Sequence, residues 1–160
     1  MWICDCAINS GLSTSTSTLA TFFKGSDTQF GIFYPTDYLV AIFPDIAMAR
    51  RAEHALGFGG FLDEDVITVP GEEVVRFAEE HLQNSSLWGM LMQQASRMFA
   101  TEEVYADHDL KLAREGAAFL AAYCPSEKRK DEAWEFIEPF GPVKARHYAL
   151  GCVEHLLGEL

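Results

Sequence analysis

Basic residues are scarce in this chain of 160 residues: 12 Lys and Arg stand against 24 Asp and Glu, a formal net charge of −12. Proteins that bind DNA or RNA normally present a basic surface, because contacts with phosphates supply much of the affinity. The same charge disfavours an anionic membrane surface, and no apolar run approaches the roughly 20 residues of a spanning helix. We therefore expect neither a nucleic acid nor a membrane as a partner.

Cysteine is also scarce, with four residues at the irregularly spaced positions Cys4, Cys6, Cys124 and Cys152. The N-terminus lacks the basic and apolar segments of a signal peptide, which favours reduced thiols and a cytoplasmic location. Cys4 and Cys6 alone are too few ligands for a structural zinc site. Nucleophile elbows, Walker loops and kinase loops are missing as well, so no catalytic motif or cofactor is predicted.

About half of the residues are apolar, enough for one domain with its own core. Residues 1–30 differ from the rest, because Leu12 to Leu19 alternate serine and threonine. We expect residues 1–30 to form a poorly packed arm and residues 31–160 to form the domain.

A weak internal repeat organises this domain. Residues 38–70 align without a gap onto residues 119–151 after a shift of 81 positions, and an apolar run, a proline, a capping residue, an amphipathic stretch and a glycine recur. The matched pairs are Leu39 with Leu120, Ala41 with Ala122, Pro44 with Pro125, Asp45 with Ser126, Ala52 with Ala133, Leu56 with Ile137, and Gly60 with Gly141. This spacing predicts two equivalent strand-helix-strand halves of one sheet.

The expected architecture is an α+β fold, a ferredoxin-like α/β sandwich in which two βαβ halves build an antiparallel four-stranded sheet. The predicted strand order is 4-1-3-2, with both repeat helices on one face. Doubly apolar runs place the strands at Tyr38 and Ala117 in the centre, where we expect them to run parallel. More polar runs place the strands at Asp65 and Val143 at the edges. In the last strand the alternation of Val143, Ala145, His147 and Ala149 predicts that only one face is covered. Residues 152–160 read as a short tail.

A helical insert, about residues 72–115, separates strands 2 and 3. Its middle part, Leu87 to Phe99, carries the widest apolar stripe. This stripe predicts either a cover for the second sheet face or a contact with another subunit, with Trp88, Met92 and Phe99 at the interface.

Several stretches resemble one bacterial family. The segments YLVAIFPD, AMARRAEHAL, EDVITV and REGAAFLAAYCPSEKRKDEAWEFIEPFG look like the small domains of the general-stress-protein family. The resemblance covers roughly Tyr38 to Tyr148 and lies in turns and patterns. It implies a ferredoxin-like fold and assigns no catalytic residue.

Two groups of residues could carry chemistry. His108 lies between Asp107 and Asp109, which suits a general acid or a metal ligand, although neighbours in a helix point in different directions and a solvated helix surface is the simpler interpretation. The second group offers nitrogen and sulfur ligands for zinc or another soft metal. Its members are His147, Tyr148, Cys152 and His155, with His108, His147 and Tyr148 as the catalytic candidates and His147, Cys152 and His155 as the metal candidates.

Three functional hypotheses follow. The first is a non-catalytic, stress-related or regulatory module that binds another protein chain and acts as a homodimer. The alternative is a small-molecule or metal-dependent enzyme with a histidine-containing pocket between the sheet and the helical insert. The third is a structural accessory domain without a ligand.

Overall fold

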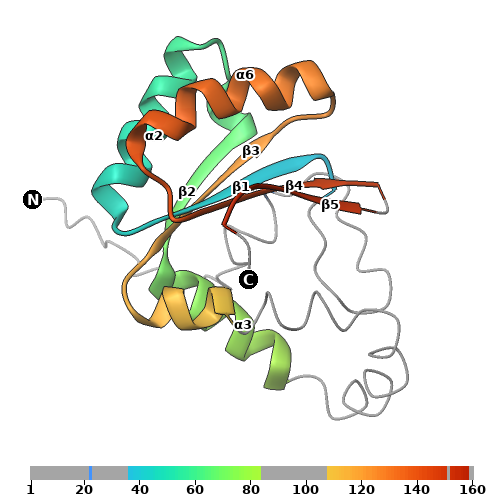
Figure 1. Ribbon diagram of the computed structural model, residues 1–160. Helices are drawn as coiled ribbons and strands as arrows, with labels where there is room; N and C mark the ends of the chain where they lie inside the picture. The colour runs from blue at the N-terminus through green and yellow to red at the C-terminus, as the bar shows by residue number, and fades with distance from the viewer. Residues whose placement is uncertain (1–21, 23–35, 84–107, 151, 159–160) are drawn as a thin grey trace, which may run out of the picture.

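The computed structural model describes Phe22 and residues 36–83, 108–150 and 152–158. These residues form one five-stranded sheet with helices on both faces (Figure 1). The elements in chain order are β1 (Tyr38–Phe43), α2 (Ile46–Phe58), the 3-10 helix η2 (Asp63–Asp65), β2 (Val66–Pro70), α3 (Gly71–Gln83), a helix of residues 108–114, β3 (Ala118–Tyr123), α6 (Glu127–Ile137), the 3-10 helix η3 (Glu138–Phe140), β4 (Lys144–Ala149) and β5 (Cys152–Leu157). No helix in this described part is long and apolar enough to cross a membrane.

The sheet has the order β2-β3-β1-β4-β5, and all neighbouring strands are antiparallel. The structure thus confirms an α+β fold with an antiparallel sheet and the relative order of the first four strands. The predicted parallel pairing of β1 and β3 is wrong, because Tyr38 lies opposite Tyr123 and Phe43 opposite Ala118. The two strands of each half run parallel to each other but are not neighbours. β3 lies between β1 and β2 of the first half, and β1 lies between β3 and β4 of the second half. Each inserted strand runs in the opposite direction to the pair beside it.

The predicted strand count is also wrong, because residues 152–157 form a fifth strand instead of a tail. β5 pairs with β4 from Ala149 and Cys152 to Ala145 and Leu157, so β4 is not an edge strand. Only two residues, 150 and 151, connect the two strands. A two-residue gap with a glycine between two strand-like runs is a hairpin signal that could have predicted β5.

The internal repeat is visible in three dimensions. Asp45 caps α2 by accepting a hydrogen bond from the Met48 N–H at 2.9 Å, and Ser126 caps α6 by accepting one from the Arg129 N–H at 3.2 Å. The two later glycines both adopt positive φ angles, +81° at Gly60 and +67° at Gly141. The matched apolar pairs are all fully buried: Leu39 and Leu120, Ala41 and Ala122, Ala52 and Ala133, Leu56 and Ile137.

The first sheet face is covered by α2 and α6 (Figure 1), and we call it the α2/α6 face. Ala49, Ala52 and Leu56 of α2 and Ala133 and Ile137 of α6 pack there against the strands. Small alanines let both helices approach the sheet closely. The predicted placement of both repeat helices on one face is therefore confirmed.

The opposite face, here the α3 face, is covered by α3 and the helix of residues 108–114. Val74 and Val75 of α3 and Leu112 and Ala113 of the shorter helix pack on the strands. These helices are the described ends of the predicted insert. Trp88, Met92 and Phe99, the predicted interface residues, lie outside the described residues, as do residues 1–21 and 23–30 of the predicted arm.

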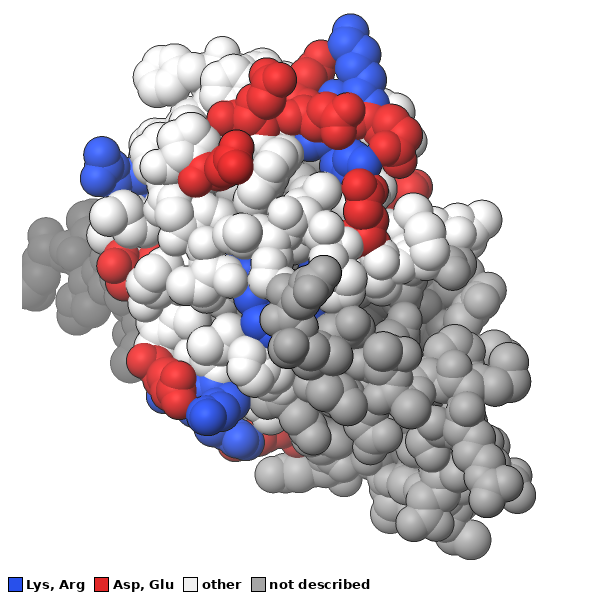
Figure 2. All heavy atoms as spheres, viewed as in Figure 1, with Lys and Arg blue, Asp and Glu red and all other residues white. Residues whose placement is uncertain are grey.

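Acidic side chains gather over α6 in the upper part of the molecule (Figure 2). The exposed carboxylates of this region include Glu127, Asp131, Glu135 and Glu138.

The two ends of the insert meet at Gly71, whose N–H donates to the Ala117 carbonyl at 2.8 Å. A Cβ at Gly71 would lie 2.6 Å from that carbonyl oxygen and would also clash with the backbone of Ala113. We predict that Gly71→Ala lowers the free energy of unfolding by about 1–3 kcal/mol, because backbone atoms cannot move aside as a flexible side chain can. Chemical denaturation measures this loss.

Gly57→Ala is the matched control, since a Cβ there meets nothing within 4 Å. In the helix α2, alanine should raise stability by up to about 1 kcal/mol. Equal stabilities of the two variants would contradict the close approach at Gly71.

Candidate functional site

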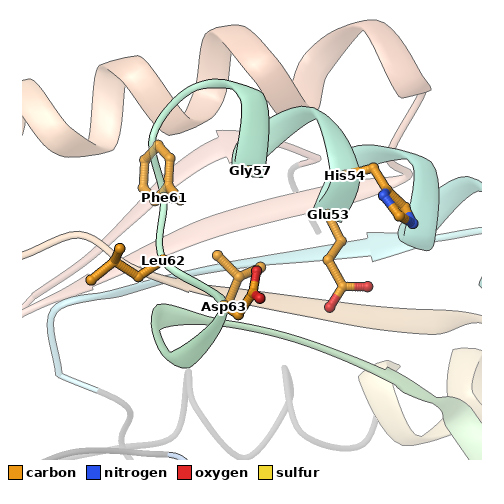
Figure 3. A pocket seen from close by; sticks show the side chains of 7 residues that line it. Glu53, His54, Gly57, Phe61, Leu62 and Asp63 are labelled. Carbon is orange, nitrogen blue, oxygen red and sulfur yellow. The ribbon is translucent and has the colours of Figure 1, made fainter.

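A small open hollow lies where α2 ends and the chain turns towards β2 (Figure 3). Its volume is about 210 Å³, below the roughly 300–1,000 Å³ of typical ligand pockets. The lining residues are Glu53, His54, Gly57, Phe61, Leu62, Asp63 and Val66. None of them is a predicted site residue, and the hollow is too small to be the main candidate site.

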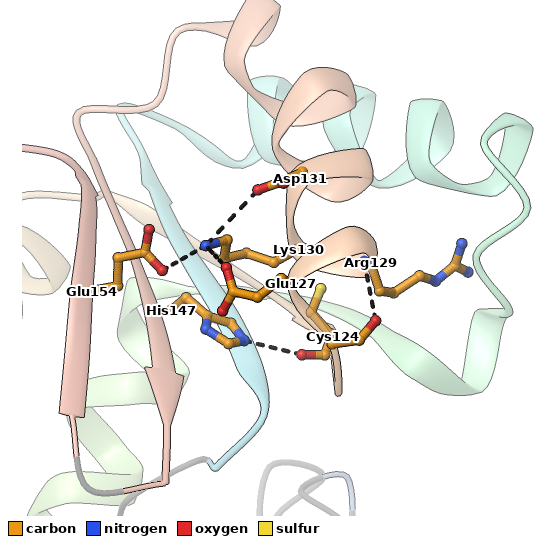
Figure 4. Close-up of polar contacts among 8 residues, drawn as sticks. Cys124, Glu127, Arg129, Lys130, Asp131, His147 and Glu154 are labelled. Carbon is orange, nitrogen blue, oxygen red and sulfur yellow. Dashed lines mark hydrogen bonds and ion pairs between the residues drawn. The ribbon is translucent and has the colours of Figure 1, made fainter.

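An ionic network of a buried lysine with exposed carboxylates lies on the α2/α6 face between α6 and β5 (Figure 4). The Lys130 ammonium donates hydrogen bonds to Glu127 and Glu154, each at 2.6 Å, and Asp131 lies at 3.8 Å. Burial lowers the pKa of Lys130, but the two hydrogen-bonded carboxylates raise it by more. The hydrogen bond and charge of Lys130 in turn lower the pKa of Glu127. The carboxylates of Glu127 and Glu154 balance the charge of the buried Lys130. We therefore interpret the network as a structural link between α6 and β5.

His147 lies beside this network and is 3% exposed. Its Nε2 is 3.0 Å from the Cys124 carbonyl oxygen, which can only accept, so Nε2 carries the proton (Figure 4). Its Nδ1 is buried without a hydrogen-bond partner. Burial raises the pKa of Cys124 to about 12, so this thiol is an inert core residue at neutral pH.

The structure does not bring the three predicted metal ligands together. His147 lies opposite Glu154 and His155 lies opposite Arg146, so the two histidines are on different faces of the sheet. Cys152 pairs with Ala149 at the hairpin end of β5. Within the described ranges, no group of three His, Cys, Asp or Glu residues is placed to hold a metal ion.

His108 is exposed, as expected for a residue on a solvated helix surface, but its ring also contacts the sheet. The first residues of the helix 108–114 contact β4 on the α3 face, where Nδ1 of His108 is 2.5 Å from Nζ of Lys144. Asp109 forms an ion pair with Arg146, two residues further along β4. The other neighbour considered in the sequence, Asp107, lies outside the described residues.

The alternation of β4 explains this arrangement. Ala145 packs in the α2/α6 core, so Lys144, Arg146 and Tyr148 point to the α3 face. Lys144 is 8% exposed and Arg146 only 2%, while Tyr148 is half-buried with the Arg146 guanidinium 5.9 Å from the centre of its ring. The expectation that only one face of this strand is covered is therefore wrong.

Burial shifts the pKa values of two residues in this cluster, Asp109 and Lys144. Burial raises the pKa of Asp109 despite the opposing charge and hydrogen bond of Arg146. Burial lowers the pKa of Lys144, with the charge of Asp109 opposing the shift and that of Arg146 adding to it. Perturbed groups gathered in one place are typical of functional sites. We therefore take His108, Asp109, Lys144 and Arg146 as the candidate site.

Sequence reasoning found only His108 and its neighbour Asp109. The sequence does contain a signal for Lys144 and Arg146, because they occupy alternate positions of a strand and so share one face. The opposite face of that strand, with Val143, Ala145, His147 and Ala149, is more apolar and was therefore expected to be the only covered one.

Comparison of the chain with protein-family models, curated proteins and solved structures found no match. The resemblance to the general-stress-protein family stays a prediction.

The Lys130 network makes a pH-dependent contribution to stability. Because the folded-state pKa of Glu127 is lowered, its contribution is present above the unfolded value of about 4.3 and is lost as the pH falls through the folded value. We predict that Lys130→Met, which keeps the stem but removes the charge, destabilises the protein at pH 7 more than at pH 3. Thermal melts of both proteins across this range test it. Lys128→Met is the control, since Lys128 is 87% exposed, and an equal effect at both pH values would contradict the network.

Proposed function

We propose that this chain is a ferredoxin-like, non-catalytic stress-related or regulatory module that binds protein and acts as a homodimer through the edge strand β5. The supporting observation is the position of β5 at the end of the strand order, with β4 as its neighbour. An edge strand presents a row of N–H and C=O groups that can pair with a strand of another chain. Four of its six residues are exposed, namely Cys152, Glu154, His155 and Leu157.

Large apolar side chains flank this edge. Leu150, in the turn before β5, is 89% exposed. At the other end, Val143 is 43% and Leu157 40% exposed. A strand that adds to β5 would cover both ends, so the hydrophobic contribution and the backbone pairing act along the same edge.

A charge on an edge strand usually opposes pairing, and β5 carries Glu154. Here the Glu154 carboxylate is bound to Lys130 at 2.6 Å on the α2/α6 face. Its charge is therefore compensated within the subunit. The irregular register between Ala145 and Arg146 confines regular pairing to the first part of β5, Cys152 to His155.

A second copy of the chain is the occupant we propose. Two copies related by a two-fold axis offer each other the same edge, so antiparallel pairing of β5 with β5 closes a dimer with one continuous sheet. The net charge of −12 per chain opposes this contact at long range. Dimerisation should therefore strengthen as salt screens the charges, whereas binding of a basic peptide would weaken.

The buried thiol of Cys124 is free. Free thiols suit a reducing compartment, which supports our proposal of a cytoplasmic location.

Multi-angle light scattering at tens of micromolar tests the dimer. We expect an average mass well above that of one chain at 0.15 M NaCl, and a mass closer to twice that of one chain at 0.5 M NaCl. The double variant Leu150→Asp, Leu157→Asp should be a folded monomer, because it places carboxylates at both ends of the edge.

Phe58→Asp, Leu62→Asp is the matched control. It adds the same charge at two exposed apolar residues, 92% and 58% exposed, near the end of α2. This control should stay dimeric. A wild-type monomer at both salt concentrations, or equal loss of the dimer in both double variants, would refute β5 as the interface.

A second candidate function is the small-molecule enzyme with a histidine-containing pocket between the sheet and the insert. The contact of His108, from the end of the insert, with Lys144 of β4 favours it. Exchange of His108 for glutamine would abolish such an activity without changing the oligomeric state.

A further inference from the structure

Two of the five lysines in this chain, Lys130 and Lys144, are buried in the part of the chain that the structure describes. Their surroundings differ. Lys130 has two carboxylates at 2.6 Å. Lys144 has no carboxylate within ion-pair distance among the described residues, and its ammonium nitrogen contacts the imidazole of His108 instead. Burying a charged lysine without a carboxylate at ion-pair distance is costly, so burial lowers the pKa of Lys144 although the nearby charge of Asp109 raises it.

We propose that Lys144 is a reactive lysine whose amine forms a Schiff base with a small carbonyl compound that carries a carboxylate, such as a 2-oxo acid. A lysine becomes nucleophilic when it is desolvated or lies beside another cation, and Lys144 meets both conditions. It is 8% exposed, and Arg146 lies two residues away on the same face of β4. The lowered pKa of Lys144, caused first by burial, agrees with this geometry.

The neighbouring groups supply the proton transfers. The lone pair of Nζ attacks the carbonyl carbon while the C=O π electrons move to oxygen. His108 Nδ1 accepts the first proton from the nitrogen and passes it to the alkoxide oxygen, which gives the carbinolamine. The second N–H proton follows the same route to the hydroxyl, which leaves as water as the C=N bond forms. The products are one imine and one water, with no oxidant or reductant.

The charge of the product explains the preference for a carboxylate. The imine nitrogen is basic, and its protonated form restores a positive charge beside Arg146. Asp109 already pairs with Arg146. A carboxylate on the bound molecule would balance the new charge, as no described carboxylate pairs with Lys144.

The chain after β5 passes close to the stem of Lys144 at a glycine. Gly158 directly follows β5 with φ +81°, and a Cβ there would lie 3.1 Å from Cγ of Lys144. His108 is exposed on the α3 face, so a small molecule would approach the amine beside its imidazole.

The test is lysine labelling of the full chain by glyoxylate and cyanoborohydride, followed by peptide mass spectrometry. Lys130, equally buried but paired, and Lys128, 87% exposed, are internal controls. Each unit by which a pKa falls raises the uncharged fraction of an amine about tenfold. We expect Lys144 to label at least about tenfold faster than Lys130 at pH 7, and its rate to level off at a lower pH than that of Lys128.

Two variants and a second probe complete the experiment. Lys144→Arg should remove the fast adduct, and His108→Gln should slow labelling of Lys144 while Lys128 stays unchanged. Labelling of Lys144 no faster than Lys130, or a pH profile parallel to that of Lys128, would overturn the proposal. Equal rates with acetaldehyde and glyoxylate would overturn the carboxylate preference. The oligomeric state plays no part in these readouts, so they are independent of the proposed dimer.

Discussion

Burial of β1 and β3 on both faces is the constraint on which the rest of this structure depends. Leu39, Ala41 and Phe43 point to one face, Tyr38 and Ile42 point to the other, and all five are fully buried. A sheet with such central strands needs a layer on each side. The repeat helices α2 and α6 provide the first layer. The second comes from the insert, whose described ends pack on the opposite face.

This second layer has a chemical consequence for β4. Its helix of residues 108–114 contacts the sheet with Leu112 and Ala113 and thereby brings His108 and Asp109 over Lys144 and Arg146. One face of the sheet thus carries the Lys130 network of α6 and β5, and on the other face Arg146 of β4 pairs with Asp109 while Lys144 contacts His108. Lys130 has two carboxylate partners, whereas Lys144 contacts an imidazole. For this reason we assign a structural role to Lys130 and propose a reactive role for Lys144.

The repeat accounts for the symmetric part of the fold, and β5 breaks that symmetry. The first half ends at the sheet edge with β2, whereas the second half continues through a two-residue turn into β5. The extra strand covers one side of β4 and supplies Glu154 to Lys130. Within the described residues it also moves the edge of the sheet outwards, to a strand flanked by Leu150 and Leu157.

The sequence alone determined the local elements, because these depend on neighbours along the chain. Apolar runs, the caps Asp45 and Ser126, and the matched residues Ala52 and Ala133 predicted the strands, the helices on one face and the order of four strands. The antiparallel direction of β3 beside β1 was decided by the crossover geometry of both halves together. The candidate site was decided by contacts about 36 residues apart, such as His108 with Lys144. Periodicity shows that Lys144 and Arg146 share a face, but only the packing of the insert shows that this face is buried and which groups meet it.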